Sequence, residues 1–83
     1  MARPHDEPVE VLRRDDAPAQ FLLNSRLYVV REVLAHWAAT ARAGAQRERW
    51  RVEAAAGRDA GVGVFDLCWS GRQPGWTASL VEE

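Results

Sequence analysis

Strict alternation of charged and apolar residues between Arg49 and Ala54 is the strongest constraint that this sequence places on its fold. Trp50, Val52 and Ala54 alternate with charged residues, so one face of the segment is apolar and the other is wet. Successive side chains of a β-strand point to opposite faces, and a helix does not have this period of two. The segment therefore predicts a strand whose apolar face lies against a core.

Other segments have the same extended character, and polar turns separate them. Phe65, Leu67 and Trp69 share one face of such a segment, and Trp76, Ala78 and Leu80 share one face of another. The further strands that we expect are residues 9–12, 19–24, 26–31, 62–69 and 76–81. The turns that we expect are residues 13–18, Asn24-Ser25 as a tight hairpin, residues 57–61 and residues 70–75.

Residues 26–42 fit two periods at once. Tyr28 and Val30 suit a strand, whereas the apolar residues from Val30 to Ala41 also follow helical spacing. We expect a strand through about Arg31. A short helix or a distorted continuation of the strand then covers residues 32–43, and both alternatives stay open here. The second half of residues 40–48 is polar and small, and we expect a loop there.

The fold class that follows is mainly β. We expect a small curled antiparallel sheet or partly open barrel of about five strands, with room for one short helix; an α+β fold is the alternative. A chain of 83 residues holds one domain with a thin core, in which Trp residues are the expected anchors. Residues 1–8 contain two prolines, so we expect a flexible lead-in there, and we expect residues 9–83 to form the single domain.

Charge and targeting signals limit the partners and the location. The formal charge of −1 gives no overall attraction to nucleic acid or to an anionic membrane, so any basic surface must be local. The only cysteine, Cys68, excludes an intrachain disulfide. The first residues lack a signal-peptide pattern, and the longest apolar run, residues 27–30, is too short to cross a bilayer. We expect a cytoplasmic protein without membrane contact.

The residues that could perform catalysis or bind metal are scattered. His5, His36 and Cys68 are far apart in the sequence, so we expect no metal site and no cofactor. A nucleophile site would combine Cys68 with His36 and Asp66. The ordinary interpretation is a packed cysteine beside a solvated aspartate, so we expect no catalytic residues and no enzyme.

Nucleic-acid binding has a more specific pattern. Four arginines flank Tyr28, Trp37 and Trp50, and these arginines are the candidate contacts to single-stranded nucleic acid or to a partner: Arg26, Arg31, Arg49 and Arg51. Arginine neutralises phosphates, and exposed rings stack on unpaired bases. Alternation nevertheless turns Trp50 away from its neighbouring arginines, and three glutamates dilute a basic patch: Glu32, Glu48 and Glu53.

Several short motifs, in their order and spacing, resemble those of a family of small actinobacterial proteins that is classified as a domain of unknown function. They are residues 20–22, 26–31, 33–34, 36–37, 49–54, 63–67 and 75–76. A looser likeness of the strands near Trp50, Phe65 and Trp76 connects that family to the C-terminal region of Y-family translesion polymerase-like proteins of the ImuB kind. The resemblance covers about residues 8–83. It implies a DNA-repair setting and transfers no active-site residue. This chain departs from the pattern at residues 40–48, where the family often has a longer connection rich in aromatic residues.

The sequence therefore predicts a noncatalytic accessory module that docks on a DNA-repair protein partner or on single-stranded DNA. The alternative is a small stand-alone enzyme or a regulator unrelated to repair. A docking module should expose an apolar patch or an unpaired sheet edge. A nucleic-acid binder should gather its arginines on one face, and an enzyme should have a pocket with converging polar groups.

Overall fold

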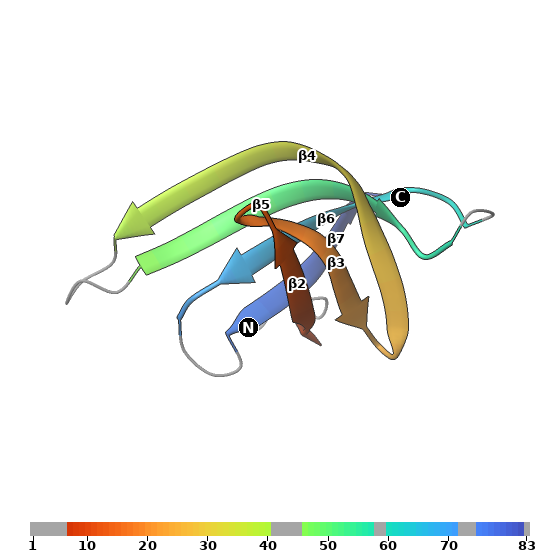
Figure 1. Ribbon diagram of the computed structural model, residues 1–83, viewed down its shortest axis with the longest axis horizontal. Helices are drawn as coiled ribbons and strands as arrows, with labels where there is room; N and C mark the ends of the chain where they lie inside the picture. Colours follow the sequence, from red (N-terminus) through yellow and green to blue (C-terminus); the bar gives the residue numbers. More distant parts are fainter. Residues whose placement is uncertain (1–6, 41–45, 58–59, 72–74, 83) are drawn as a thin grey trace.

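The chain forms one antiparallel sheet of seven strands in the order β1-β7-β6-β5-β4-β3-β2. The computed structural model describes residues 7–40, 46–57, 60–71 and 75–82. The strands are β1 (Glu7–Pro8), β2 (Glu10–Arg14), β3 (Ala17–Leu23), β4 (Arg26–Thr40), β5 (Gln46–Ala55), β6 (Gly63–Trp69) and β7 (Trp76–Glu82). From β2 onwards each strand pairs with the next strand of the chain, as in a meander (Figure 1).

β4 is the longest strand, and it bends. Its pairing with β5 slips twice, between Val30 and Glu32 and between Val33 and Ala35. Each slip leaves one residue of β4, Arg31 or Leu34, without a partner in β5, and such bulges bend and twist a strand. Figure 1 shows β4 arching away from its hairpin with β3 and then over β5. The sheet therefore curls into a half-barrel with a concave inner face and a convex outer face.

The two bulges also decide the ambiguous segment. Residues 32–40 are strand, so the helical alternative is wrong for them and the distorted continuation is confirmed. Residues 41–43 lie outside the described part. On the inner face of β4, side chains recur at Tyr28, Val30, Val33 and His36, because each bulge adds one residue to the period of two. The three-residue steps from Val30 to Val33 and from Val33 to His36 imitate part of the spacing of a helix.

The N-terminal segment, residues 7–14, supplies the strands at both edges of the sheet. In β1, Glu7 pairs with Ala78 of β7, and the Val9 N–H then donates to the Trp76 carbonyl at 3.1 Å. The next residue begins β2, which pairs with β3 at the opposite end of the sheet. Val9 is buried between them. The sheet thus starts at Glu7 and not at Val9, and it has seven strands where about five were expected.

Two tight turns set the registers of the first three long strands. Asn24 and Ser25 have φ values of 52° and 65°, the backbone of the two-residue hairpin expected there. Asp15 and Asp16 form the same kind of turn, with φ values of 53° and 66°. The turn predicted at residues 13–18 is therefore confirmed at Asp15-Asp16 but is shorter than expected, because the residues on either side are strand. Its proline, Pro18, lies in β3 beside a register shift, where a strand tolerates a missing N–H.

The core covers the inner face. Phe21, Val52 and Leu67 are the largest fully buried side chains, and Phe21 stacks on Tyr28 with ring centres 5.1 Å apart. The inward faces predicted for β5 and β6 are confirmed by the buried set, which is Val9, Phe21, Trp50, Val52, Ala54, Phe65, Leu67 and Ala78.

Other boundaries differ by a few residues. β5 begins at Gln46, so the predicted loop is wrong for residues 46–48, which are strand. Parts of the predicted lead-in and turns lie outside the described residues, namely 1–6, 41–45, 58–59 and 72–74. Within the described ranges there is no helix of the length and apolarity needed to cross a membrane.

Shortening a core leucine should destabilise this sheet far more than shortening a surface one. Leu67 is fully buried and Leu12 is 58% exposed. We expect Leu67→Ala to lower the free energy of unfolding by about 2–5 kcal/mol, because it leaves a cavity. Leu12→Ala should change it by less than about 0.5 kcal/mol. Urea denaturation followed by tryptophan fluorescence measures both, and equal losses would contradict the burial described above.

Candidate functional site

The outer face of β4 and β5 carries a tryptophan covered by arginine. Trp37 in β4 lies directly opposite Arg49 in β5. The Arg49 Cζ atom is 4.3 Å from the centre of the Trp37 ring, and the Arg51 Cζ atom is 5.6 Å from it. Both are cation–π distances. Trp37 is 43% exposed, so the prediction that tryptophans anchor the core is wrong for this one.

A groove of about 540 Å³ lies on this part of the sheet, and we call it the outer groove. Four strands contribute, because Cys68 of β6 is opposite Arg49 and Thr77 of β7 is opposite Cys68. Its lining residues are Trp37, Ala38, Ala39, Arg47, Glu48, Arg49, Cys68, Trp69, Ser70, Gly75 and Thr77. Arg47 and Arg49 are exposed, whereas other side chains bind the carboxylate of Glu48.

Arg51 has a structural partner. Its Nε and Nη2 atoms donate to the two carboxylate oxygens of Asp66 at 2.8 and 3.0 Å, a bidentate pair. These hydrogen bonds, with the negative charge of Asp66, raise the pKa of Arg51 above its ordinary value. Asp66 is 6% exposed, so the expectation of a solvated aspartate is wrong. Its register position opposite Arg51 explains why it is buried.

The other two candidate arginines lie elsewhere. Arg26 begins β4 beside the β3–β4 turn and lines a pocket near the end of β5, whereas Arg47 lies near its start. Arg31 occupies the first bulge and lines a shallow depression with Val29, Ala55 and Gly57. The structure therefore brings Arg49 and Arg51 together at Trp37, and it places Arg26 and Arg31 outside the outer groove.

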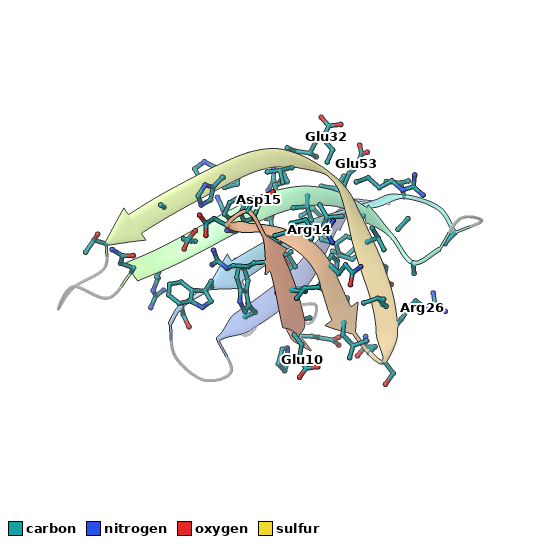
Figure 2. The ribbon with its side chains drawn as sticks, viewed as in Figure 1. Glu10, Arg14, Asp15, Arg26, Glu32 and Glu53 are labelled. Carbon is teal, nitrogen blue, oxygen red and sulfur yellow. The ribbon has the colours of Figure 1, made fainter. Side chains whose placement is uncertain are left out.

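Two glutamates interrupt the basic surface. Glu32 of β4 lies directly opposite Glu53 of β5, two residues along β5 from Arg51. Figure 2 shows both side chains on the outside of the bend. Like charges in this position repel each other and any polyanion. The cationic part of the outer surface therefore extends from Arg49 toward Arg47 and not toward the bend.

The inner face of the same hairpin carries a second polar cluster. Arg13 reaches from β2 to Glu48 of β5, with 3.5 Å between Nη2 and Oε2. Its Cζ atom is 4.9 Å from the ring centre of Trp76 and 5.8 Å from that of Trp69. Arg13 also donates to the Asp16 carbonyl at 3.2 Å. This arginine thus connects the N-terminal segment to the last three strands.

Glu48 joins this cluster to an imidazole. The His36 ring N–H donates to the Glu48 carboxylate at 2.9 Å. The His36 ring stacks on Trp50 with ring centres 3.5 Å apart. The buried Trp50 Nε1 atom has no hydrogen-bond partner among the described residues. Sequence reasoning missed this cluster, although alternation with Trp50 places Glu48 on the inward face.

The three residues that a nucleophile site would combine do not come together. Cys68 lies opposite Arg49 on the outer face, whereas His36 lies opposite Trp50 on the inner face. The sheet itself separates them, and Asp66 is bound to Arg51. In the part of the chain that the structure describes, no three His, Cys, Asp or Glu side chains form a cluster that could hold a metal ion.

A family model described as a domain of unknown function (DUF6504) matches residues 1–79. No curated protein and no solved structure matches the chain significantly.

The two arginines at Trp37 should differ in what their removal does to stability. Arg51→Ala leaves the buried Asp66 carboxylate without its cation, and an unpaired buried charge is costly. Arg49→Ala leaves no buried group unpaired. We therefore expect Arg51→Ala to lower the urea midpoint clearly more than Arg49→Ala, as measured by tryptophan fluorescence.

The double variant Arg51→Ala/Asp66→Asn provides the control. It also removes the unpaired charge of Asp66, so its urea midpoint should lie between those of Arg51→Ala and the unmodified protein. If Arg49→Ala and Arg51→Ala unfold at the same urea concentration, Arg51 has no special structural role.

Proposed function

The chain belongs to the DUF6504 family, and on that premise we propose that it is a noncatalytic accessory module that binds single-stranded nucleic acid in its outer groove. The observation that carries the proposal is the half-exposed Trp37 ring with Arg49 stacked over it. Arg47 lies beside them in the same groove.

The chemistry of this groove suits an unpaired strand. Proteins that bind single strands combine a positive groove for the backbone with aromatic side chains on which bases stack. Trp37 offers such a ring, and stacking contributes about 1–3 kcal/mol per base. Arg47 and Arg49 provide the cations. Since the chain as a whole carries a formal charge of −1, binding must depend on this local arrangement.

The pair of Glu32 and Glu53 favours one path for the backbone of the bound strand. Glu32 and Glu53 lie beyond Arg51, at the bend. A polyanion avoids them if its backbone follows Arg49 and Arg47 toward the β4–β5 end of the sheet. Arg51 contributes less, because Asp66 already neutralises it.

The setting is part of the same proposal. The resemblance of the strands near Trp50, Phe65 and Trp76 to the C-terminal region of translesion polymerase-like proteins supports a role in DNA repair.

A second candidate function is docking of a protein partner. The outer face of β2, β3 and β4 exposes Leu12, Leu22, Leu27 and Val29, and Leu22 pairs with Leu27 across the strands. β3 pairs with β4 only as far as Val29. Among the described residues, no strand pairs with the other edge of residues 31–40. An exposed apolar patch and an open edge are features of docking modules.

A fluorescence titration with oligothymidylate at several salt concentrations tests the first candidate. Trp37 supplies a signal because it is exposed, and phosphate contacts must weaken as salt rises. We expect the double variant Arg47→Ala/Arg49→Ala to bind more weakly. The slope of log affinity against log salt concentration should become less negative by about 1.4, or about 0.7 for each lost phosphate contact.

The matched control is Arg26→Ala/Arg31→Ala, which removes the same charge outside the groove. It should leave the salt slope unchanged. Equal weakening in both double variants would mean that net charge and not the groove attracts the strand. No response of the unmodified protein at low salt would contradict nucleic-acid binding and leave the protein partner as the better candidate.

A further inference from the structure

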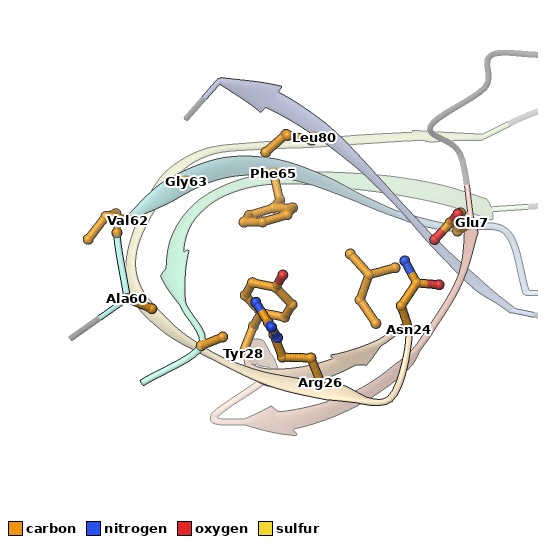
Figure 3. A pocket seen from close by; sticks show the side chains of 12 residues that line it. Glu7, Asn24, Arg26, Tyr28, Ala60, Val62, Gly63, Phe65 and Leu80 are labelled. Carbon is orange, nitrogen blue, oxygen red and sulfur yellow. The ribbon is translucent and has the colours of Figure 1, made fainter. Parts of the chain in front are cut away.

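A separate pocket of about 460 Å³ opens between the β3–β4 turn, the connection from β5 to β6, and β7. It lies near the end of β5, whereas the outer groove lies near its start. Its volume is within the usual range for small-molecule sites. Figure 3 shows side chains from Glu7, the β3–β4 turn, β6 and β7 around one space. The proposed nucleic-acid groove uses none of these residues.

One side of the pocket is apolar and open. Phe65 is buried at its base, whereas Leu80 is 41% exposed and Val62 is 43% exposed. Leu80 pairs with Phe65 and shares its face of the sheet, so its exposed surface faces the pocket (Figure 3). An apolar ligand would remove this surface from water, which is favourable in proportion to the area covered.

The other side carries a cation and a hydroxyl. Arg26 and Tyr28 lie two residues apart at the start of β4, so they share one face of the strand, and both line the pocket (Figure 3). Neither side chain makes a hydrogen bond or an ion pair with another described residue. In Figure 3 the Glu7 and Asn24 side chains lie at one end of the pocket and those of Val62 and Ala60 at the other, with Arg26 and Tyr28 between them. Arg26 supplies the positive charge among the described lining residues. A guanidinium beside a hydroxyl matches the geometry of a carboxylate.

We propose that this pocket binds a small amphipathic carboxylate. The carboxylate accepts hydrogen bonds from Arg26 and Tyr28, and the apolar body lies against Leu80 and Phe65. This binding is independent of the outer groove, and it needs no change in the fold.

NMR titration of the ¹⁵N-labelled full chain with 3-phenylpropanoate tests the proposal. We expect saturable shifts of the Tyr28, Gly63 and Phe65 amides. Two ligands of matched skeleton provide the comparison: 3-phenylpropanamide, which is neutral, and phenethylamine, which is cationic. Each should bind about tenfold more weakly or worse, as expected when a charge-assisted hydrogen bond is lost.

Variants separate the charge from the shape of the pocket. Arg26→Gln should weaken the binding of 3-phenylpropanoate by about tenfold and leave the binding of 3-phenylpropanamide unchanged. Tyr28→Phe keeps the stacked ring and should cost a few-fold. Arg31→Gln, a control outside the pocket, should leave the affinity for both ligands unchanged. Backbone amide signals that keep their positions away from the substituted residue show that each variant is folded.

Three results would overturn the proposal. The first is the absence of localised shifts at millimolar ligand. The second is equal affinity for the carboxylate and the amide. The third is an Arg26→Gln variant that weakens both ligands equally, since this would mean that the substitution reshapes the pocket and removes no specific contact.

Discussion

The two bulges in β4 are the constraint on which the rest of this structure depends. A regular strand of 15 residues would keep the sheet nearly flat, and 83 residues could not cover both of its faces. The extra residues Arg31 and Leu34 bend β4, so that its first part pairs with β3 and its later part pairs with β5. The sheet then encloses its own core, and the segment with Val9 connects its two ends.

The same curvature gives one hairpin two different faces. Along β5, Glu48 and Trp50 point inward while Arg49 points outward, and β4 repeats the pattern with His36 and Trp37. The inner groups belong to a cluster that Arg13 completes from β2. The outer groups form the groove. The outer groove therefore lies on the opposite face of the β4–β5 hairpin from this cluster. A bound strand would lie on a surface that an ion pair, a hydrogen bond and stacked rings stabilise on the inner face.

Local patterns predicted the part of this arrangement that depends on alternation. The period of two in residues 49–54 predicted a strand with Trp50 inside and arginines outside, which is confirmed. It failed where register matters. The bulges in β4 imitate helical spacing, and the buried ion pair of Asp66 with Arg51 depends on the register of β5 and β6. The cluster around Arg13 depends on a segment that crosses from one end of the sheet to the other, and no local pattern contains that information.

The most direct test of the outer groove as the binding surface is to map the amide shifts that a short oligothymidylate causes in the ¹⁵N-labelled protein. We expect the largest shifts at Trp37, Arg47, Arg49 and Cys68, with the amides around Tyr28 and Leu80 unaffected. Shifts centred on the exposed leucines of β2 and β3, or on the pocket beside Arg26, would contradict it.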